Sequence, residues 1–180
     1  MKNSSLIELV KLSIEERFEN TSLVDSSLKE KYHELTEQRA TFVTLNLNGN
    51  LRGCIGSLLP RRTLFDDIVS NAKAAAFEDP RFSPLTPEEF KNIEIEISIL
   101  SIPTLLEYED IDDLKSKLKI GIDGVILKDG IYQATFLPSV WEQLPTFELF
   151  FTHLCAKAGL NQNCLEKHPE IYIYQAEKIR

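Results

Sequence analysis

Cys54, a side chain suited to covalent chemistry, is separated from the cation Arg52 by a single glycine. The nucleophilic form of cysteine is the thiolate, and a neighbouring guanidinium lowers the pKa of a thiol because it stabilises the charged form. Residues i and i+2 on a β-strand share one face of the sheet, roughly 6 to 7 Å apart. If Arg52 and Cys54 lie on one strand, the sequence therefore predicts a thiol beside a guanidinium.

One glycine lies within this pair and another follows shortly after it. Gly53 and Gly56 have no side chain, so a ligand or another strand can approach the backbone closely there. Cysteine is also among the most buried residue types and often packs as a small hydrophobic side chain. These residues alone leave both a functional and a structural role for Cys54 open.

The element that must position Cys54 is a β-hairpin over residues 41–57. Asn48-Gly49 separates two apolar runs and is a strong hairpin signal. A two-residue loop would pair Leu45 with Arg52, which mixes apolar and polar positions on one face. We therefore predict an odd-length loop, for example a turn with a G1 bulge, because it separates the two kinds of side chain. The core-facing set is then Val43, Leu45, Leu47, Leu51, Gly53 and Ile55, and the polar set is Thr44, Asn46, Arg52 and Cys54.

Two other segments supply candidate site residues. Glu94 and Glu96 lie on the polar side of an alternating run, 93–100, and would act as a general base or orient Arg52 if that strand lies beside the hairpin. The same alternation also fits an ordinary solvated strand face. The segment Asp79-Pro80-Arg81-Phe82 is a compact polar cluster, which equally fits a rigid turn with a local ion pair of little energetic worth.

Histidines and cysteines near the C-terminus superficially suggest a metal site: His153, Cys155, Cys164 and His168. On a helix, however, His153 and Cys155 point in different directions, and neither pair has the usual two-residue ligand spacing. We therefore expect no metal and no cofactor, with Cys155 in the core and His153 exposed. The chain also has no phosphate-binding glycine loop, dinucleotide fingerprint or nucleophile elbow.

The length and composition favour one cytoplasmic domain or two closely joined subdomains. A chain of 180 residues can fold without disulfides, and three cysteines at irregular spacing are typical of a reducing compartment, so we predict that all three thiols are free. We expect no signal peptide and no membrane span, because no apolar run is long enough. A formal net charge of −8 argues against nucleic-acid binding.

Helical and strand patterns alternate along the chain. Helices are expected to begin near Ser5, Thr63, Thr86, Asp110 and Thr146, the last running to Lys157 with Gly159 as its cap, and a short helix is expected near 28–33. Further strands are expected over 93–100, in a second hairpin through Asp129-Gly130, and over 170–176. Because two connections are hairpins, we predict an α+β fold with a mostly antiparallel sheet flanked by helices.

Five successive motifs of this chain resemble those of the AMMECR domain family. They are Phe42-Val43-Thr44-Leu45, Leu51-Arg52-Gly53-Cys54-Ile55-Gly56-Ser57, Asp79-Pro80-Arg81-Phe82, Phe136-Leu137-Pro138 with Val140-Trp141, and Lys157-Ala158-Gly159-Leu160. The resemblance covers nearly the whole chain, and the second motif is highly specific. Two positions depart from the family pattern: Ala40-Thr41 stands where a glycine is common, and Ser57 replaces the commoner threonine.

The resemblance implies a single AMMECR domain over residues 1–180, built from two subdomains, the larger formed by N- and C-terminal segments. It also implies a site around Arg52, Gly53, Cys54 and Gly56, with Asp79, Arg81 and Phe82 as a second cluster. The combined candidate catalytic residues are Cys54, Arg52, Glu94 and Glu96. The candidate substrate-binding residues are Thr44, Gly53, Gly56, Ser57, Asp79 and Arg81.

The resemblance implies no particular reaction. It does imply an association with a Memo-like protein and a radical-SAM protein, as in AmmeMemoRadiSam system protein A. Our leading hypothesis is an enzyme or enzyme component that acts on a small-molecule or protein substrate. In it, Cys54 is the nucleophile or attachment point and Arg52 stabilises the thiolate or an anion. The alternative is a non-enzymatic binding module that docks such a partner through the Arg52 and Cys54 face of the hairpin.

Overall fold

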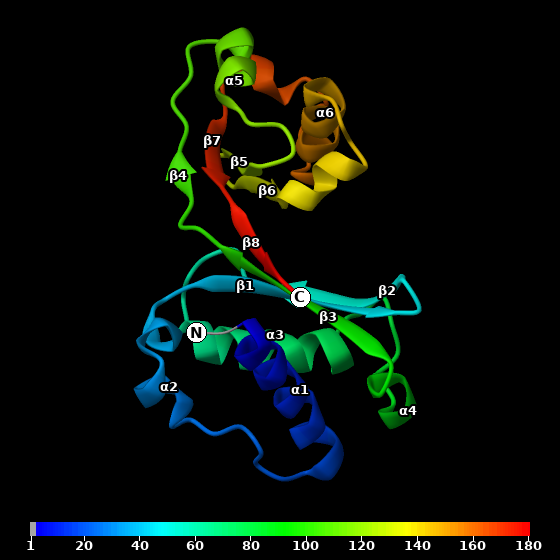
Figure 1. Cartoon of the computed structure of the whole chain (residues 1–180). Coiled ribbons are helices and arrows are strands. Elements are labelled where there is room, and N and C mark those ends of the chain that lie inside the picture. The colour runs from blue at the N-terminus through cyan, green and yellow to red at the C-terminus, as the bar shows by residue number, and fades with distance from the viewer. Residues whose placement is uncertain (1–2) are drawn as a thin grey trace. The chain divides into compact units, whose positions relative to one another are not determined.

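A computed structural model describes residues 3–180 and divides them into two compact units. Unit 1 comprises the described residues up to Leu100 together with Glu177–Arg180, and unit 2 comprises Ser101–Ala176. Each unit contains one four-stranded sheet with its own helices (Figure 1). The α+β class is confirmed, with the antiparallel pairs divided between two sheets.

The helices and strands follow the chain in this order. The first half contains α1 (Asn3–Glu19), α2 (Leu28–Lys31), the 3₁₀ helix η1 (His33–Thr36), β1 (Ala40–Leu47), β2 (Asn50–Gly56), α3 (Leu64–Phe77), α4 (Pro87–Phe90) and β3 (Ile93–Leu100). The second half contains β4 (Thr104–Leu105), α5 (Ile111–Lys117), β5 (Gly124–Asp129), β6 (Tyr132–Phe136), η2 (Pro138–Glu142), α6 (Phe147–Lys157), η3 (Cys164–Lys167), β7 (Glu170–Tyr174) and β8 (Ala176–Ile179).

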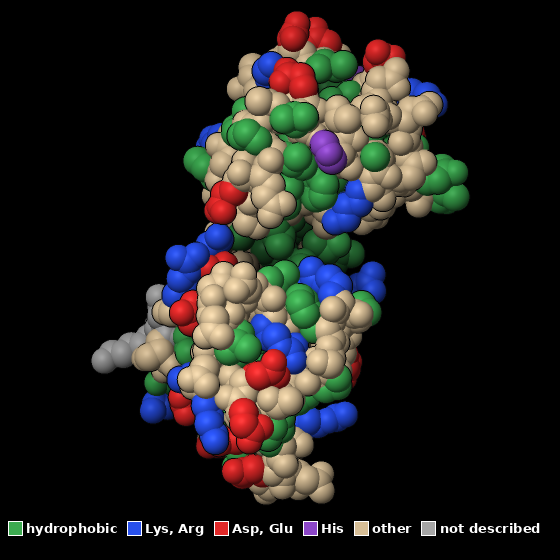
Figure 2. All heavy atoms as spheres, turned by 90° about the vertical axis from the view of Figure 1, so that its right-hand side faces the viewer, with side chains coloured by type: hydrophobic (Ala, Val, Ile, Leu, Met, Phe, Trp, Pro, Cys, Tyr) green, Lys and Arg blue, Asp and Glu red, His purple; other side chains and the backbone are tan. Residues whose placement is uncertain are grey.

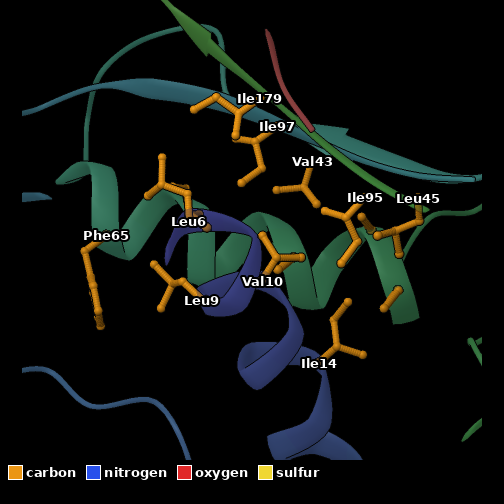
Figure 3. Packing of buried hydrophobic residues seen from close by; sticks show 14 of the residues in the cluster. Leu6, Leu9, Val10, Ile14, Val43, Leu45, Phe65, Ile95, Ile97 and Ile179 are labelled. Atoms are coloured by element: carbon orange, nitrogen blue, oxygen red, sulfur yellow. The ribbon is translucent and has the colours of Figure 1, made fainter. Parts of the chain in front are cut away.

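Helices α1 and α3 cover one face of the unit 1 sheet, whose strand order is β2-β1-β3-β8. Their apolar side chains meet those of the sheet in one core, and Figure 3 shows Leu9 and Val10 of α1 packed beneath Val43 and Ile97 of the strands. Helix α3 begins where predicted, because the Thr63 hydroxyl accepts the Asp66 N–H. Since Val43 points into this core, its neighbour Thr44 lies on the opposite face of the sheet.

The turn of the β1–β2 hairpin differs from the prediction. Asn48 and Gly49 form a two-residue loop with positive φ angles of 52° and 78°, as a type I′ turn requires, and Leu47 pairs with Asn50. The predicted odd-length loop, with Leu47 opposite Leu51, is therefore wrong.

A bulge restores the predicted register before Cys54 is reached. Asn46 pairs with Leu51 and Leu45 pairs with Gly53, so Arg52 is an extra residue on β2. One inserted residue shifts the pairing by one position whether it lies in the turn or in the strand. Beyond it the pairs are those expected of the odd loop: Leu45 with Gly53, Thr44 with Cys54, and Val43 with Ile55.

The sheet of unit 2 has the strand order β4-β7-β5-β6. Its core is rich in aromatic residues, with the rings of Trp141 and Phe150 stacked 3.7 Å apart. Helix α6 begins after the predicted cap Thr146. The β5–β6 turn is Gly130-Ile131 rather than Asp129-Gly130, because Asp129 pairs with Tyr132.

The single C-terminal strand predicted over 170–176 is two strands in two sheets. Strand β7 pairs with β4 and β5 in unit 2, whereas β8 joins the edge of the unit 1 sheet beside β3. The backbone N–H of Gln175, between them, is accepted by the Ser101 hydroxyl. The chain therefore returns to unit 1 and places Ile179 in its core (Figure 3).

Cys155 and Cys164 form a disulfide between α6 and η3, with Cα atoms 5.8 Å apart. The prediction of three free thiols is therefore wrong, and Cys54 is the free cysteine. Gly159, at a positive φ of 80°, turns the chain back after α6 and brings the two sulfurs within bridging range. The cysteine count no longer supports a reducing compartment.

His153 and His168 each lie against a backbone carbonyl. His153 Nδ1 lies 2.8 Å from the Leu149 carbonyl, and His168 Nε2 lies 2.9 Å from the Tyr108 carbonyl.

Acidic and basic side chains are interspersed on the face shown in Figure 2. No helix within residues 3–180 is both long enough and apolar enough to cross a membrane.

Candidate functional site

Cys54 lies on the face of the unit 1 sheet that α1 and α3 leave uncovered. It is half-buried, and its Sγ lies 3.3 Å from Oγ1 of Thr44, the residue directly opposite on β1. Either atom of this hydroxyl–thiol pair can be the donor. The contact limits the orientations that the thiol can adopt.

The segment that follows α3 holds the backbone of Cys54. Strand β2 is at the edge of its sheet, so the outward-facing N–H and C=O of Cys54 have no neighbouring strand. Asp79 Oδ2 accepts the Cys54 N–H at 2.9 Å, and Arg81 Nη2 donates to the Cys54 carbonyl at 3.2 Å. Asp79 and Arg81 therefore make the two backbone hydrogen bonds to Cys54 that a neighbouring strand would otherwise make.

Asp79 and Arg81 also bind each other. Arg81 donates through Nε and Nη2 to the two carboxylate oxygens, at 2.9 and 2.7 Å, in a bidentate pair. These bonds are the main reason that the pKa of the buried Asp79 lies well below its usual range, although burial opposes them. The pKa of Arg81 is raised, chiefly by its hydrogen bonds to Asp79, and an electrostatic interaction with Cys54 adds a smaller part. Arg81 is thus a cation close enough to Cys54 to interact with it.

Arg52 is engaged with Glu89 at the start of α4. Its Nε and Nη2 donate to Glu89 Oε1 and Oε2 at 2.9 and 3.0 Å, and its side chain is 12% exposed. This bond is the main cause that lowers the pKa of Glu89 to about 2. Arg52 is the extra residue of the bulge, so it has no partner opposite it on β1.

Phe82 connects the two predicted clusters. The guanidinium carbons of Arg52 and Arg81 lie 5.8 and 5.4 Å from the centre of its ring, within range of a cation–π interaction. The fold therefore brings together candidate residues from two separate parts of the sequence, the hairpin and the segment after α3.

Glu94 and Glu96 lie on the strand beside the hairpin, on the far side of β1 from Cys54. Glu96 is opposite Thr44, so Cys54, Thr44 and Glu96 form a row across three strands. Two strand spacings separate the ends of the row by about 10 Å at Cα. Glu96 forms ion pairs with two cations near the C-terminus, Lys178 at 3.6 Å and Arg180 at 2.6 Å, whereas Glu94 is exposed.

The space beside the two candidate glycines is occupied by the protein itself. A Cβ on Gly53 would lie 2.1 Å from the carbonyl oxygen of Ala75 in α3, and one on Gly56 would lie 2.2 Å from the Phe42 ring. Gly53 therefore permits α3 to pack directly under the strand that carries Cys54. Ser57 donates to Asp67 at 2.8 Å.

Asp67 is at the centre of a buried polar network that sequence reasoning missed. Its carboxylate, 1% exposed, accepts hydrogen bonds from the Thr41 N–H and hydroxyl, the Asn71 amide, the Ser57 hydroxyl and the Arg62 guanidinium. The network joins the start of α3 to β1 and to the end of the hairpin. The available signal was a polar pair four residues apart, Asp67 and Asn71, inside the apolar stripe of α3.

The arrangement can support nucleophilic chemistry. It combines a half-buried cysteine, a hydroxyl in contact with its thiol, and a guanidinium that donates to its backbone carbonyl. Across residues 3–180, no three His, Cys, Asp or Glu side chains are grouped so that they could hold a metal ion.

Comparisons with known proteins give one consistent family. The AMMECR1 family model matches residues 7–179. A protein of Methanothermobacter thermautotrophicus is 36% identical over 182 residues, which cover 96% of this chain and 91% of that protein. Protein TK0174 of Thermococcus kodakarensis is 34% identical over 183 residues, which cover 96% and 86% of the two chains.

A solved structure has the same fold. The crystal structure of the uncharacterized protein PH0010 from Pyrococcus horikoshii matches with a TM-score of 0.83 at 34% sequence identity. The match covers 96% of this chain and 88% of that one. The similarity therefore extends across both units.

Proposed function

The chain belongs to the AMMECR1 family, and on that premise we propose that it performs covalent chemistry at Cys54. The observation that carries this proposal is that Cys54 is held at two places. Asp79 and Arg81 hydrogen-bond to its backbone, and Thr44 contacts its thiol. Groups that are locked by a supporting shell on a regular element are preorganised for reaction. Packing alone would not require this clamp.

The proposed step is a nucleophilic displacement that leaves an acyl or alkyl group on the sulfur. The S–H bond of Cys54 breaks, and a sulfur lone pair forms a bond to an electrophilic carbon of the substrate. The bonding pair to the leaving group departs with that group, which takes up a proton, so atoms and electrons balance. Arg81 favours the thiolate electrostatically, and Thr44 donates a hydrogen bond to it. Glu96, at the end of the row, is the candidate base for a substrate that lies along it.

Alkylation of the folded protein tests this proposal. The disulfide leaves one free thiol, so we expect iodoacetamide to add one adduct per chain, measured by intact mass, and none in Cys54→Ser. The reference rate is that of the same thiol in protein unfolded in urea without reductant. We expect folded Cys54 to react faster at neutral pH. An equal or slower rate in the folded protein would show that the fold does not activate the thiol.

A docking surface on the same hairpin is the second candidate. Leu51, next to the bulge, is 42% exposed, and exposed apolar side chains contribute to protein–protein contacts. A Memo-like or radical-SAM protein is the partner that we propose for this surface. In this case Cys54→Ser retains binding and Arg52→Ala loses it.

Glu89→Ala is the control for that experiment, because it breaks the same ion pair but keeps the guanidinium. Loss of binding in Arg52→Ala but not in Glu89→Ala, measured by calorimetry with the purified partner, would support docking. Loss in Cys54→Ser alone would contradict it and favour the covalent role.

A further inference from the structure

Unit 2 contains a cavity that no part of the proposed Cys54 chemistry uses. It has a volume of about 520 Å³ and lies between the segment after β4 and the segment that enters β7. Its lining comes from residues 105–109, from Lys117, and from residues 168–171. Cavities of this size are typical of sites for small organic molecules.

One wall of the cavity is the aromatic pair Tyr108 and His168, which is held by stacking and by hydrogen bonds. The rings of Tyr108 and His168 stack 4.1 Å apart at an angle of 11°. The Tyr108 hydroxyl donates to the Pro169 carbonyl at 2.6 Å, and the Tyr108 carbonyl accepts from His168 Nε2. Because these contacts join segments about sixty residues apart, the wall is rigid before any ligand arrives.

Part of the remaining surface of the cavity is apolar. Leu106, Pro169 and Ile171 contribute to its lining, together with Leu105, which is 51% exposed on the edge strand β4. Such a surface gains free energy when it covers hydrocarbon, so it favours a ligand with an apolar body.

The charges that line the cavity are mainly negative. Glu107, Glu109 and Glu170 supply three carboxylates, against one cation, Lys117. The Lys117 ammonium is already bonded to the Asp113 carboxylate at 2.7 Å and to the Glu107 carbonyl at 3.0 Å. Within the part of the chain that the structure describes, the carboxylates of Glu107 and Glu109 have no hydrogen-bond or ion-pair partner.

We propose that this cavity binds an organic ammonium ion with an apolar body. The ammonium group lies against Glu107 and Glu109, and the apolar body lies on Leu106 and the Tyr108–His168 wall. An anionic ligand would be repelled by the same carboxylates, and a neutral one would gain no charge attraction from them. A bare metal ion fits poorly, because no suitable group of ligands occurs among residues 3–180.

Three probes of similar shape and different charge test this proposal on the full chain: phenethylamine, phenethyl alcohol and hydrocinnamate. We expect calorimetry to show saturable binding of the amine, with the alcohol and the carboxylate at least about tenfold weaker. In the variant Glu107→Gln/Glu109→Gln, the affinity for the amine should fall by about tenfold or more, with no loss of folded signal by circular dichroism.

The matched control is Asp129→Asn/Glu142→Gln, which removes the same net charge from unit 2 at residues outside the lining. We expect it to bind the amine as the unmodified protein does. Equal losses in both double variants would mean that the acidic protein attracts the amine nonspecifically, and the proposal would fail. It would also be overturned if the alcohol binds as well as the amine, or if the amine shows no saturable binding at millimolar concentration.

Discussion

The positive charge that accompanies Cys54 comes from Arg81. Its Nη2 donates to the Cys54 carbonyl, and the same guanidinium neutralises the buried carboxylate of Asp79. Arg52, although nearer in sequence, gives its donors to Glu89 and to the Pro84 carbonyl. The two arginines therefore make different predictions for thiol reactivity.

Arg81→Gln should slow alkylation of Cys54 at neutral pH by about tenfold, because it removes a cation and leaves the Asp79 carboxylate unpaired beside the thiolate. Arg52→Gln should change the rate much less. The double variant Asp79→Asn/Arg81→Gln should recover part of the loss, since both charges are then absent. The measurement is the second-order rate with iodoacetamide. Equal slowing by the two arginine variants would show that Arg52 also supports the thiolate.

Glu89 should contribute a defined acid dependence to stability. Its pKa is lowered from 4.5 to about 2, chiefly by the hydrogen bond from Arg52. A carboxyl with a lower pKa in the folded state stabilises that state fully above its ordinary value. This contribution is lost as pH falls from about 4.5 toward about 2. We therefore expect the free energy of unfolding of Glu89→Gln, measured in urea, to fall less than that of the unmodified protein across this window. Parallel pH profiles would argue against the ion pair.

At the scale of elements, the approach of α3 to β2 decides where the thiol is held. Gly53 lies over the backbone of Ala75, and the chain that leaves α3 supplies Asp79 to the neighbouring Cys54. The bulge at Arg52 puts the next residues in the register that faces Gly53 toward α3 and Cys54 away from it. One inserted residue thus orients the candidate site.

Gly53→Ala should destabilise the protein by about 3 kcal/mol, because the new Cβ meets a helix backbone that cannot move alone. Gly49→Ala is the control, since its Cβ would meet no atom within 4 Å and only the positive φ is unfavourable. Its expected cost is about 1 kcal/mol. Urea unfolding measures both. A cost for Gly53→Ala no larger than that for Gly49→Ala would mean that α3 and β2 can separate locally.

At the scale of the whole molecule, the chain completes unit 1 with its last residues. Strand β8 joins the sheet edge beside β3, and Ile179 is 3% exposed in a core otherwise made by the first hundred residues. Unit 1 therefore cannot be complete until the C-terminal segment is in place. A substitution at the extreme C-terminus should act on the unit that contains Cys54.

Ile179→Ala should cost about 3 kcal/mol, as expected for a buried isoleucine truncated to alanine. Ile131→Ala makes the same chemical change at a side chain that is 92% exposed, in the β5–β6 turn. Its expected cost is below about 0.5 kcal/mol. Amide exchange should show the loss of protection for Ile179→Ala in the strands of unit 1. Loss confined to unit 2 would contradict the assignment of β8.

Local signals predicted most of the elements. The cap Thr63, the capping box at Thr86 and the alternation over 93–100 act between residues close in sequence, and each element is present. Features that depend on how the chain folds back on itself were predicted less accurately. The hairpin turn is a two-residue loop followed by a bulge, and Cys155 and Cys164, predicted free, form a disulfide because the chain turns back after α6.

The sequence by itself determined the α+β class, the family and the hairpin that carries Cys54, because periodicity, capping residues and motifs are properties of short segments. Only the tertiary structure decided that Arg52 binds Glu89, that Asp79 and Arg81 hold Cys54, and that the last strand divides between two sheets. These outcomes depend on contacts between segments tens of residues apart. Their energies arise from packing and pairing in three dimensions, which no local pattern records.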